Sequence, residues 1–104
     1  MTGAGTDSVE DVTRRIADRL RGLPDVAALS AGRFGTVTTP VVGGRIEGVA
    51  LRPDSVEVGV VVRYGRPLPQ LAADLRAEIA PLARGRRIDV SIEDVVPPPE
   101  GART

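Results

Sequence analysis

The chain has 104 residues, of which 41% are hydrophobic and 27% charged, and its 14 basic and 14 acidic residues give a formal net charge of +0. This length suits one domain, and the neutral balance argues against a general nucleic-acid or anionic-membrane binder, which needs a basic excess. Cysteine and histidine are absent, which excludes cysteine nucleophiles, disulfides, iron–sulfur clusters, most zinc sites and histidine-based acid–base catalysis.

Both ends of the chain are predicted to be disordered. Residues 1–6 are small and polar and lack the basic start and apolar stretch of a secretory signal. Residues 97–104 begin with three prolines, which favour extended polyproline backbone. The longest dense apolar run, Val58–Val62, is far shorter than the ~20 residues that span a bilayer. We therefore expect one domain over residues 7–96 in a soluble, cytoplasmic protein.

A first amphipathic helix is predicted from about Ser8 to Arg21. Asp7 or Ser8 can cap its N-terminus, and Gly22 indicates its end. Its polar face is rich in arginine, and Arg14 is expected to pair with Asp18 four residues later. Apolar residues at three- and four-residue spacing form the other face: Val9, Val12, Ile16, Leu20 and Leu23.

The middle of the chain is predicted to consist of strands. Alternation is strongest over Val56–Tyr64, where every second residue is apolar and shares one face. The turn residues Arg52–Ser55 precede this strand and predict a hairpin, and Pro40 and the pair Gly43-Gly44 interrupt the region before it. We expect strands at Val26–Ala31, Arg33–Thr39, Arg45–Leu51 and Val56–Tyr64.

A second amphipathic helix is predicted over Pro69–Ala83, followed by a strand over Arg86–Val96. Pro81 is expected to kink or end the last helical turn, and Gly85 to cap it. The fold class is therefore α+β: two amphipathic helices packed on one face of a small mixed β-sheet, in the order α-β(3-4)-α-β. The strands on either side of the second helix are expected to be parallel.

The order and spacing of these features resemble a known family. They include Arg63-Tyr64-Gly65 after the alternating strand, Leu68-Pro69 at the start of the second helix, and the alternating Ile88–Ile92 in the last strand. Together with the opening stretch VTRRIADRLRGLPDVAALSAGRFG, they are similar to the alkaline shock protein family of envelope stress response proteins, and most similar to its actinobacterial branch. The resemblance covers about residues 9–96, and the long segment Gly32–Gly44 departs from the family's usual pattern.

The resemblance implies a small α/β protein without a known reaction, associated with cell-envelope or alkaline stress. Some members of the family are recruited to the inner face of the membrane by a membrane-anchored partner, and some self-associate. The family has no catalytic residues to transfer to this chain.

The acidic and glycine-rich segments are not typical of a catalytic site. Glu93 and Asp94 are adjacent and point to opposite faces of a strand, and Asp89 lies about 13 Å from Glu93 along extended backbone. The segment Gly32–Gly35 and the pair Gly43-Gly44 fit neither the P-loop nor the dinucleotide fingerprint. We predict no catalytic, cofactor-binding or metal-binding residues.

Four residues are candidates for contact with another macromolecule. Arg84, Arg86 and Arg87 either complement the dipole at the end of the second helix or take phosphates of a lipid or RNA. Phe34 is either a core residue or an exposed anchor for a partner. Tyr64, by contrast, is expected to pack at the edge of the core with its hydroxyl in water.

The sequence favours a non-enzymatic interaction or scaffold protein of the envelope stress type. Its expected partners are a protein, such as a small membrane anchor, and a second copy of itself, with no metal, and it would reach the membrane through the partner. The alternative is a small nucleic-acid-binding module that uses its arginine clusters. The strand over 56–64 and the threonine-rich segment over 34–39 are expected to offer edges on which another chain can pair.

Overall fold

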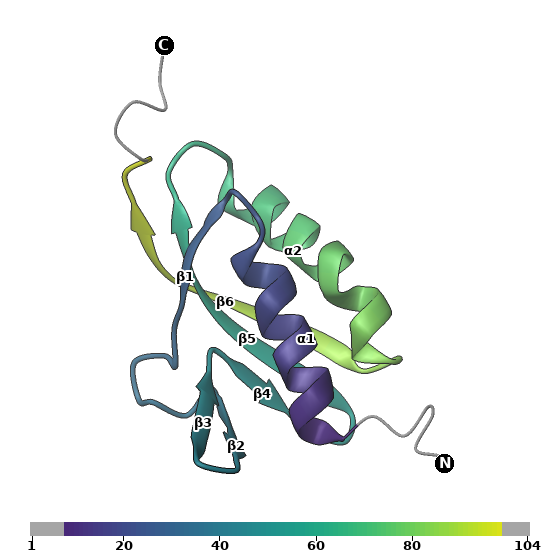
Figure 1. Ribbon diagram of the computed structural model, residues 1–104. Coiled ribbons are helices and arrows are strands. Elements are labelled where there is room, and N and C mark those ends of the chain that lie inside the picture. Colours follow the sequence, from purple (N-terminus) through teal and green to yellow (C-terminus); the bar gives the residue numbers. More distant parts are fainter. Residues whose placement is uncertain (1–7, 99–104) are drawn as a thin grey trace.

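The computed structural model describes residues 8–98, and these form two helices and six strands (Figure 1). The predicted α+β class is confirmed. Five strands rather than three or four precede the second helix, because Gly48 divides the segment expected as one strand. The predicted disorder of residues 1–6 and 97–104 lies outside the described residues, apart from Pro97 and Pro98. The elements are α1 (Val9–Arg21), β1 (Val26–Leu29), β2 (Thr38–Val41), β3 (Gly44–Glu47), β4 (Val49–Leu51), β5 (Ser55–Arg63), α2 (Leu68–Ala83) and β6 (Arg87–Val96).

Strand β5 is the centre of the main sheet. Strand β6 pairs with it in parallel along its whole length, from Ser55 opposite Arg87 to Arg63 opposite Val96. The other edge of β5 is shared by two antiparallel strands, β4 on its first half and β1 on its second. The sheet is therefore mixed and its two longest strands are parallel, as predicted. The hypothesis that β5 offers a pairing edge is wrong, because both of its edges are occupied.

The strands β1 and β4 meet beside β5 at two glycines. The amide of Gly59 donates to the carbonyl of Gly48 at 2.9 Å, and the amide of Ser30 donates to the carbonyl of Gly59 at 2.9 Å. A Cβ on Gly59 would lie 2.3 Å from the Ser30 carbonyl oxygen, and one on Gly48 would lie 2.5 Å from the Cβ of Leu29. Gly48 also has φ +91°. Both positions therefore require glycine.

Both helices cover one face of the sheet (Figure 1). The side chains of Val56, Val58, Val60 and Val62 point to this face and are fully buried, as the alternation predicts. Burying apolar area of this kind contributes about 25 cal/mol per Å² removed from water, so this layer stabilises the fold. The helices contribute Val12, Ile16, Leu20, Leu71, Leu75 and Ile79 to the same core.

Helix α1 has the predicted caps but different ion pairs. The hydroxyl of Ser8 accepts a hydrogen bond from the Asp11 amide at 3.1 Å, and the helix ends at Gly22. The expected pair between Arg14 and Asp18 is wrong. Arg14 instead contacts Glu10 at 2.9 Å, because an acid four residues before a base is the favourable order along the helix dipole.

Three further predictions need correction. The strand expected over Arg33–Thr39 begins only at Thr38, because Gly32 and Gly35 have positive φ and turn the chain. Tyr64 does not pack at the core edge: it follows the last residue of β5 and is 75% exposed, where Gly65 turns the chain toward α2. Helix α2 reaches its predicted end at Ala83, but its C-terminal cap is Arg84 in the left-handed conformation and not the predicted Gly85.

We expect Gly59→Ala to lower the free energy of unfolding by about 1–3 kcal/mol, because its Cβ would overlap the Ser30 carbonyl. The matched control is Gly44→Ala, since a Cβ at Gly44 meets nothing within 4 Å and this residue has no positive φ. Urea unfolding followed by circular dichroism measures both. Equal stability of the two variants would contradict the close contact between β1 and β5.

Candidate interaction surface

The segment between β1 and β4 forms an arm that stands away from the main sheet (Figure 1). We call residues 31–47 the hairpin arm. It contains a loop over 32–36 and the antiparallel pair β2–β3, in which Thr38 lies opposite Glu47 and Val41 opposite Gly44. The turn that joins the two strands uses Gly43 at φ +85°. The arm includes the segment Gly32–Gly44 that departs from the resembled family.

The base of the hairpin arm is fastened to the domain by buried polar contacts. The hydroxyl of Thr39 donates to the Val49 carbonyl at 2.8 Å and accepts from the Leu51 amide at 3.3 Å, so it occupies the outer edge of β4. Val37 is 3% exposed, and its carbonyl accepts from the Gly48 amide at 2.8 Å. The predicted pairing edge over residues 34–39 is therefore wrong: β2 is paired with β3 and Thr39 faces β4.

The far parts of the arm expose apolar side chains. Phe34 is 82% exposed and Val42 is 94% exposed. Phe34 sits in a turn closed by a hydrogen bond of 3.1 Å from the Gly35 amide to the Gly32 carbonyl. Of the two interpretations of Phe34, the structure excludes the core residue and leaves the exposed anchor. Aromatic side chains in such positions dominate the energetics of many interfaces.

The arginine cluster after α2 is largely engaged within the fold. Arg86 donates from Nε to the Arg52 carbonyl at 2.8 Å and from a terminal nitrogen to the Ala83 carbonyl at 3.1 Å. It thus joins the end of α2 to the turn between β4 and β5. Arg87 contacts Asp89 at 3.3 Å, and Arg84 has φ +56° where α2 ends.

Two arginines that the sequence did not single out hold the β5–α2 end of the fold. Arg63 donates to the carbonyls of Pro24 and Val26 at 2.6 and 2.8 Å. Arg66 lies between two carboxylates, hydrogen-bonded to Asp74 and, at 2.7 Å, to Asp25. The hydrogen bonds that Arg66 donates to Asp74 and Asp25 raise its pKa above the ordinary value. These partners are distant in sequence, so local spacing could not reveal them.

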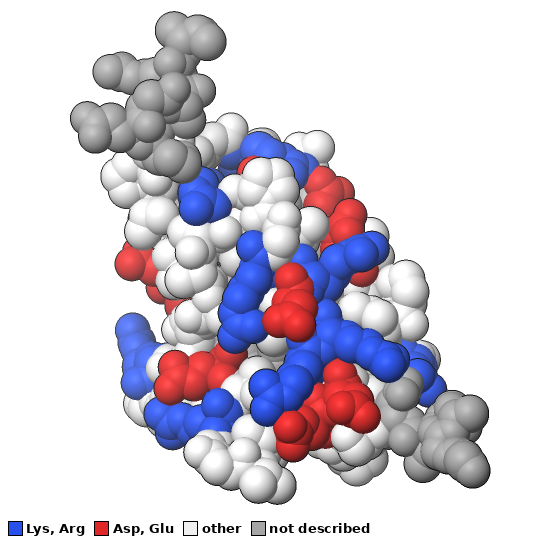
Figure 2. Space-filling model, viewed as in Figure 1, with Lys and Arg blue, Asp and Glu red and all other residues white. Residues whose placement is uncertain are grey.

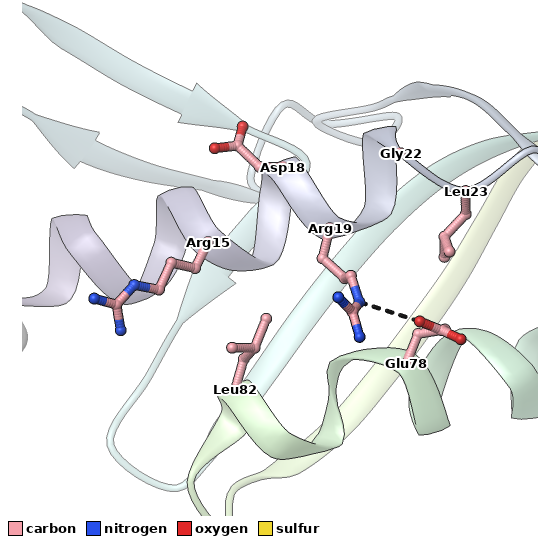
Figure 3. A pocket seen from close by; sticks show the side chains of 7 residues that line it. All are labelled: Arg15, Asp18, Arg19, Gly22, Leu23, Glu78 and Leu82. Carbon is pink, nitrogen blue, oxygen red and sulfur yellow. Dashed lines mark hydrogen bonds and ion pairs between the residues drawn. The ribbon is translucent and has the colours of Figure 1, made fainter.

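An open groove with a volume of about 590 Å³ lies between the two helices (Figure 3). Arg19 crosses it and meets Glu78 at 3.1 Å. The other acidic residue that lines the groove, Asp18, points away from Glu78 in Figure 3, so the two carboxylates do not form an acid–base pair. Figure 2 shows basic and acidic side chains intermixed over this face. The groove is therefore a polar surface between the helices that the Arg19–Glu78 ion pair bridges.

Residues 8–98 contain neither a cluster of metal ligands nor a membrane-spanning helix. No group of three or more acidic side chains in this range is arranged to hold a metal ion. Neither helix in the range is long and apolar enough to cross a membrane.

Comparison of the chain with protein-family models, with curated proteins and with solved structures gives no match.

We expect Thr39→Val to loosen the hairpin arm, because the buried Val49 carbonyl and the Leu51 amide lose their shared partner. The cost should be about 1–3 kcal/mol in the free energy of unfolding. Thr38→Val, half-buried next to it, is the control and should change stability by less than about 0.5 kcal/mol. Amide hydrogen exchange of residues 31–47 should accelerate only in the first variant, and similar exchange in both would count against the anchoring role.

Proposed function

We propose that this protein is a non-enzymatic scaffold of the envelope or alkaline stress type that acts by binding other proteins. A membrane-anchored protein partner recruits it to the cytoplasmic face of the membrane. The resemblance of residues 9–96 to the alkaline shock protein family motivates this assignment, and the exposed side chains of the hairpin arm offer a surface for such a partner.

The observation that carries the proposal is the exposure of Phe34, the only phenylalanine of the chain, at 82%. Leaving an aromatic ring in water forgoes the free energy of burying it. The loop that holds the ring is closed by its own hydrogen bond and continues into a strand fastened to β4 through Thr39. A fixed loop loses little conformational entropy on binding, which favours affinity for a partner.

Nucleic-acid binding receives less support. An arginine patch that takes phosphates needs side chains free to leave the fold, whereas Arg86 donates to two backbone carbonyls. The mixed charges in Figure 2 also differ from the continuous basic stripe of a nucleic-acid interface.

The test is co-purification from native membranes. An affinity-tagged chain expressed in the source organism should fractionate with membranes together with a small membrane-anchored protein, and Phe34→Ala should reduce this fraction at least about tenfold, the loss of a typical aromatic hot spot.

The matched control is Tyr64→Ala, which removes another exposed aromatic ring, at 75% exposure, from the turn before α2. It should leave the membrane fraction unchanged. Full membrane recovery of the Phe34→Ala protein, or equal loss in both variants, would show that the arm is not the docking element. Salt-dependent binding of RNA at sub-micromolar affinity would favour the alternative.

A further inference from the structure

The outer edge of β6 has no partner strand within residues 8–98. This strand has ten residues and pairs only with β5, along its inner edge. The corresponding edge of β4 is occupied by Thr39 of the hairpin arm. The longest unpaired strand edge of the described domain is therefore that of β6, and an edge of this kind can receive a strand from another chain.

The direction of the backbone groups along β6 follows from its contacts with β5. The amide of Arg87 donates to the Asp54 carbonyl at 3.0 Å, so Arg87 points its polar groups toward β5. Backbone groups alternate in direction along a strand. Asp89 and Ser91 therefore also point inward, and the amides and carbonyls of Ile88, Val90 and Ile92 point to the free edge. These three residues are the ones available to a further strand.

Charged side chains mark one face of the same segment. Arg87 and Asp89 are exposed, and the hydroxyl of Ser91 donates to the carboxylate of Glu93 on the same face. At Glu93 the ladder is interrupted, because Val60 lies opposite Ile92 and Val61 opposite Asp94. Regular backbone thus runs from Arg87 to the bulge at Glu93, a segment with a base at one end and an acid at the other.

We propose that a second copy of this chain pairs with this edge, antiparallel to it, with the two-fold axis at Val90. In this register Val90 lies opposite Val90 of the second copy and Ile88 opposite Ile92, and all of these residues direct their backbone groups to the free edge. Arg87 of each copy lies opposite Glu93 of the other, which brings opposite charges together twice. The pairing joins the two sheets into one.

Charge selects this register over its neighbours. Centring the axis on Asp89 would place two aspartates opposite each other. Centring it on Ser91 would place Asp89 opposite Glu93 twice, and like charges directly opposite are destabilising in a sheet. The register centred on Val90 avoids both contacts and ends at the bulge, so the regular segment is used in full.

This inference extends the proposed function, since a paired molecule presents two hairpin arms, but it does not rest on the capture of a membrane partner. Failure of the pairing would leave the Phe34-dependent recruitment intact, and failure of that recruitment would leave the pairing of the purified chain intact. The two proposals are therefore distinguishable by experiment.

The first experiment is sedimentation equilibrium of the full chain from about 10 μM to about 1 mM, a range suited to a small interface. We expect a monomer–dimer equilibrium. Arg87→Glu and Glu93→Arg should each raise the dissociation constant at least about tenfold, because each creates two repulsive contacts across the axis. The double variant R87E/E93R restores both pairs and should return the constant to within about threefold of the original.

A chain that stays monomeric throughout this range would overturn the proposal. So would a dimer that neither single charge reversal weakens, or one that the double reversal fails to restore. Both substituted side chains are exposed, and circular dichroism of each variant verifies that the fold is kept.

A second experiment tests the register directly by disulfide cross-linking. The chain has no cysteine of its own, so only the introduced cysteines can form a disulfide. Asp89 of one copy lies opposite Ser91 of the other in the proposed pairing, within the separation that a disulfide spans. A mixture of Asp89→Cys and Ser91→Cys chains should form a disulfide-linked dimer under mild oxidation. Either variant alone should cross-link at least about tenfold more slowly, since its own cysteines are two residues out of register. Equal rates in all three samples would overturn the register.

Discussion

The close backbone contact among Ser30, Gly48 and Gly59 is the constraint on which the rest of the structure depends. It allows two short strands, β1 and β4, to share a single edge of β5. That arrangement keeps β5 central, so its four buried valines form a continuous apolar surface on which both helices pack. A side chain at Gly48 or Gly59 would push these strands apart and disturb the apolar surface of β5 on which the helices pack.

Several arginines stabilise this fold by joining segments that are distant in sequence. Arg63 joins the end of β5 to the start of β1, Arg66 links two acids from separate segments, and Arg86 ties α2 to the turn before β5. The planar guanidinium suits this role because it can donate to two acceptors at once. In a chain with no lysine and no formal net charge, these arginines of residues 8–98 thus act within the fold.

Periodicity predicted the elements that bury a complete face, namely α1, α2 and β5, together with the α+β class, and the crossover through α2 indicated the parallel pairing of β5 with β6. Periodicity failed where a single residue sets the local backbone conformation. Gly48 within an otherwise strand-like segment was the available signal for a break, since a glycine inside a strand pattern indicates a bulge or a close approach. The exposure of Phe34 was not predictable, because a lone aromatic ring suits a core and an interface equally. The partners of Arg63 and Arg66 depend on tertiary contacts that no local spacing encodes.

The hairpin arm leaves the sheet at Ser30 and returns at Gly48, and both residues hydrogen-bond to the same Gly59. Its two ends are therefore held next to each other by the domain itself, whatever lies between them. The entropy of closing such a loop grows only slowly with its length. Changes of length in the exposed loop over 32–36 or in the turn at 42–43 therefore cost the core little, whereas Val37, Thr39 and Ile46 of the arm are buried and belong to the packing of the domain.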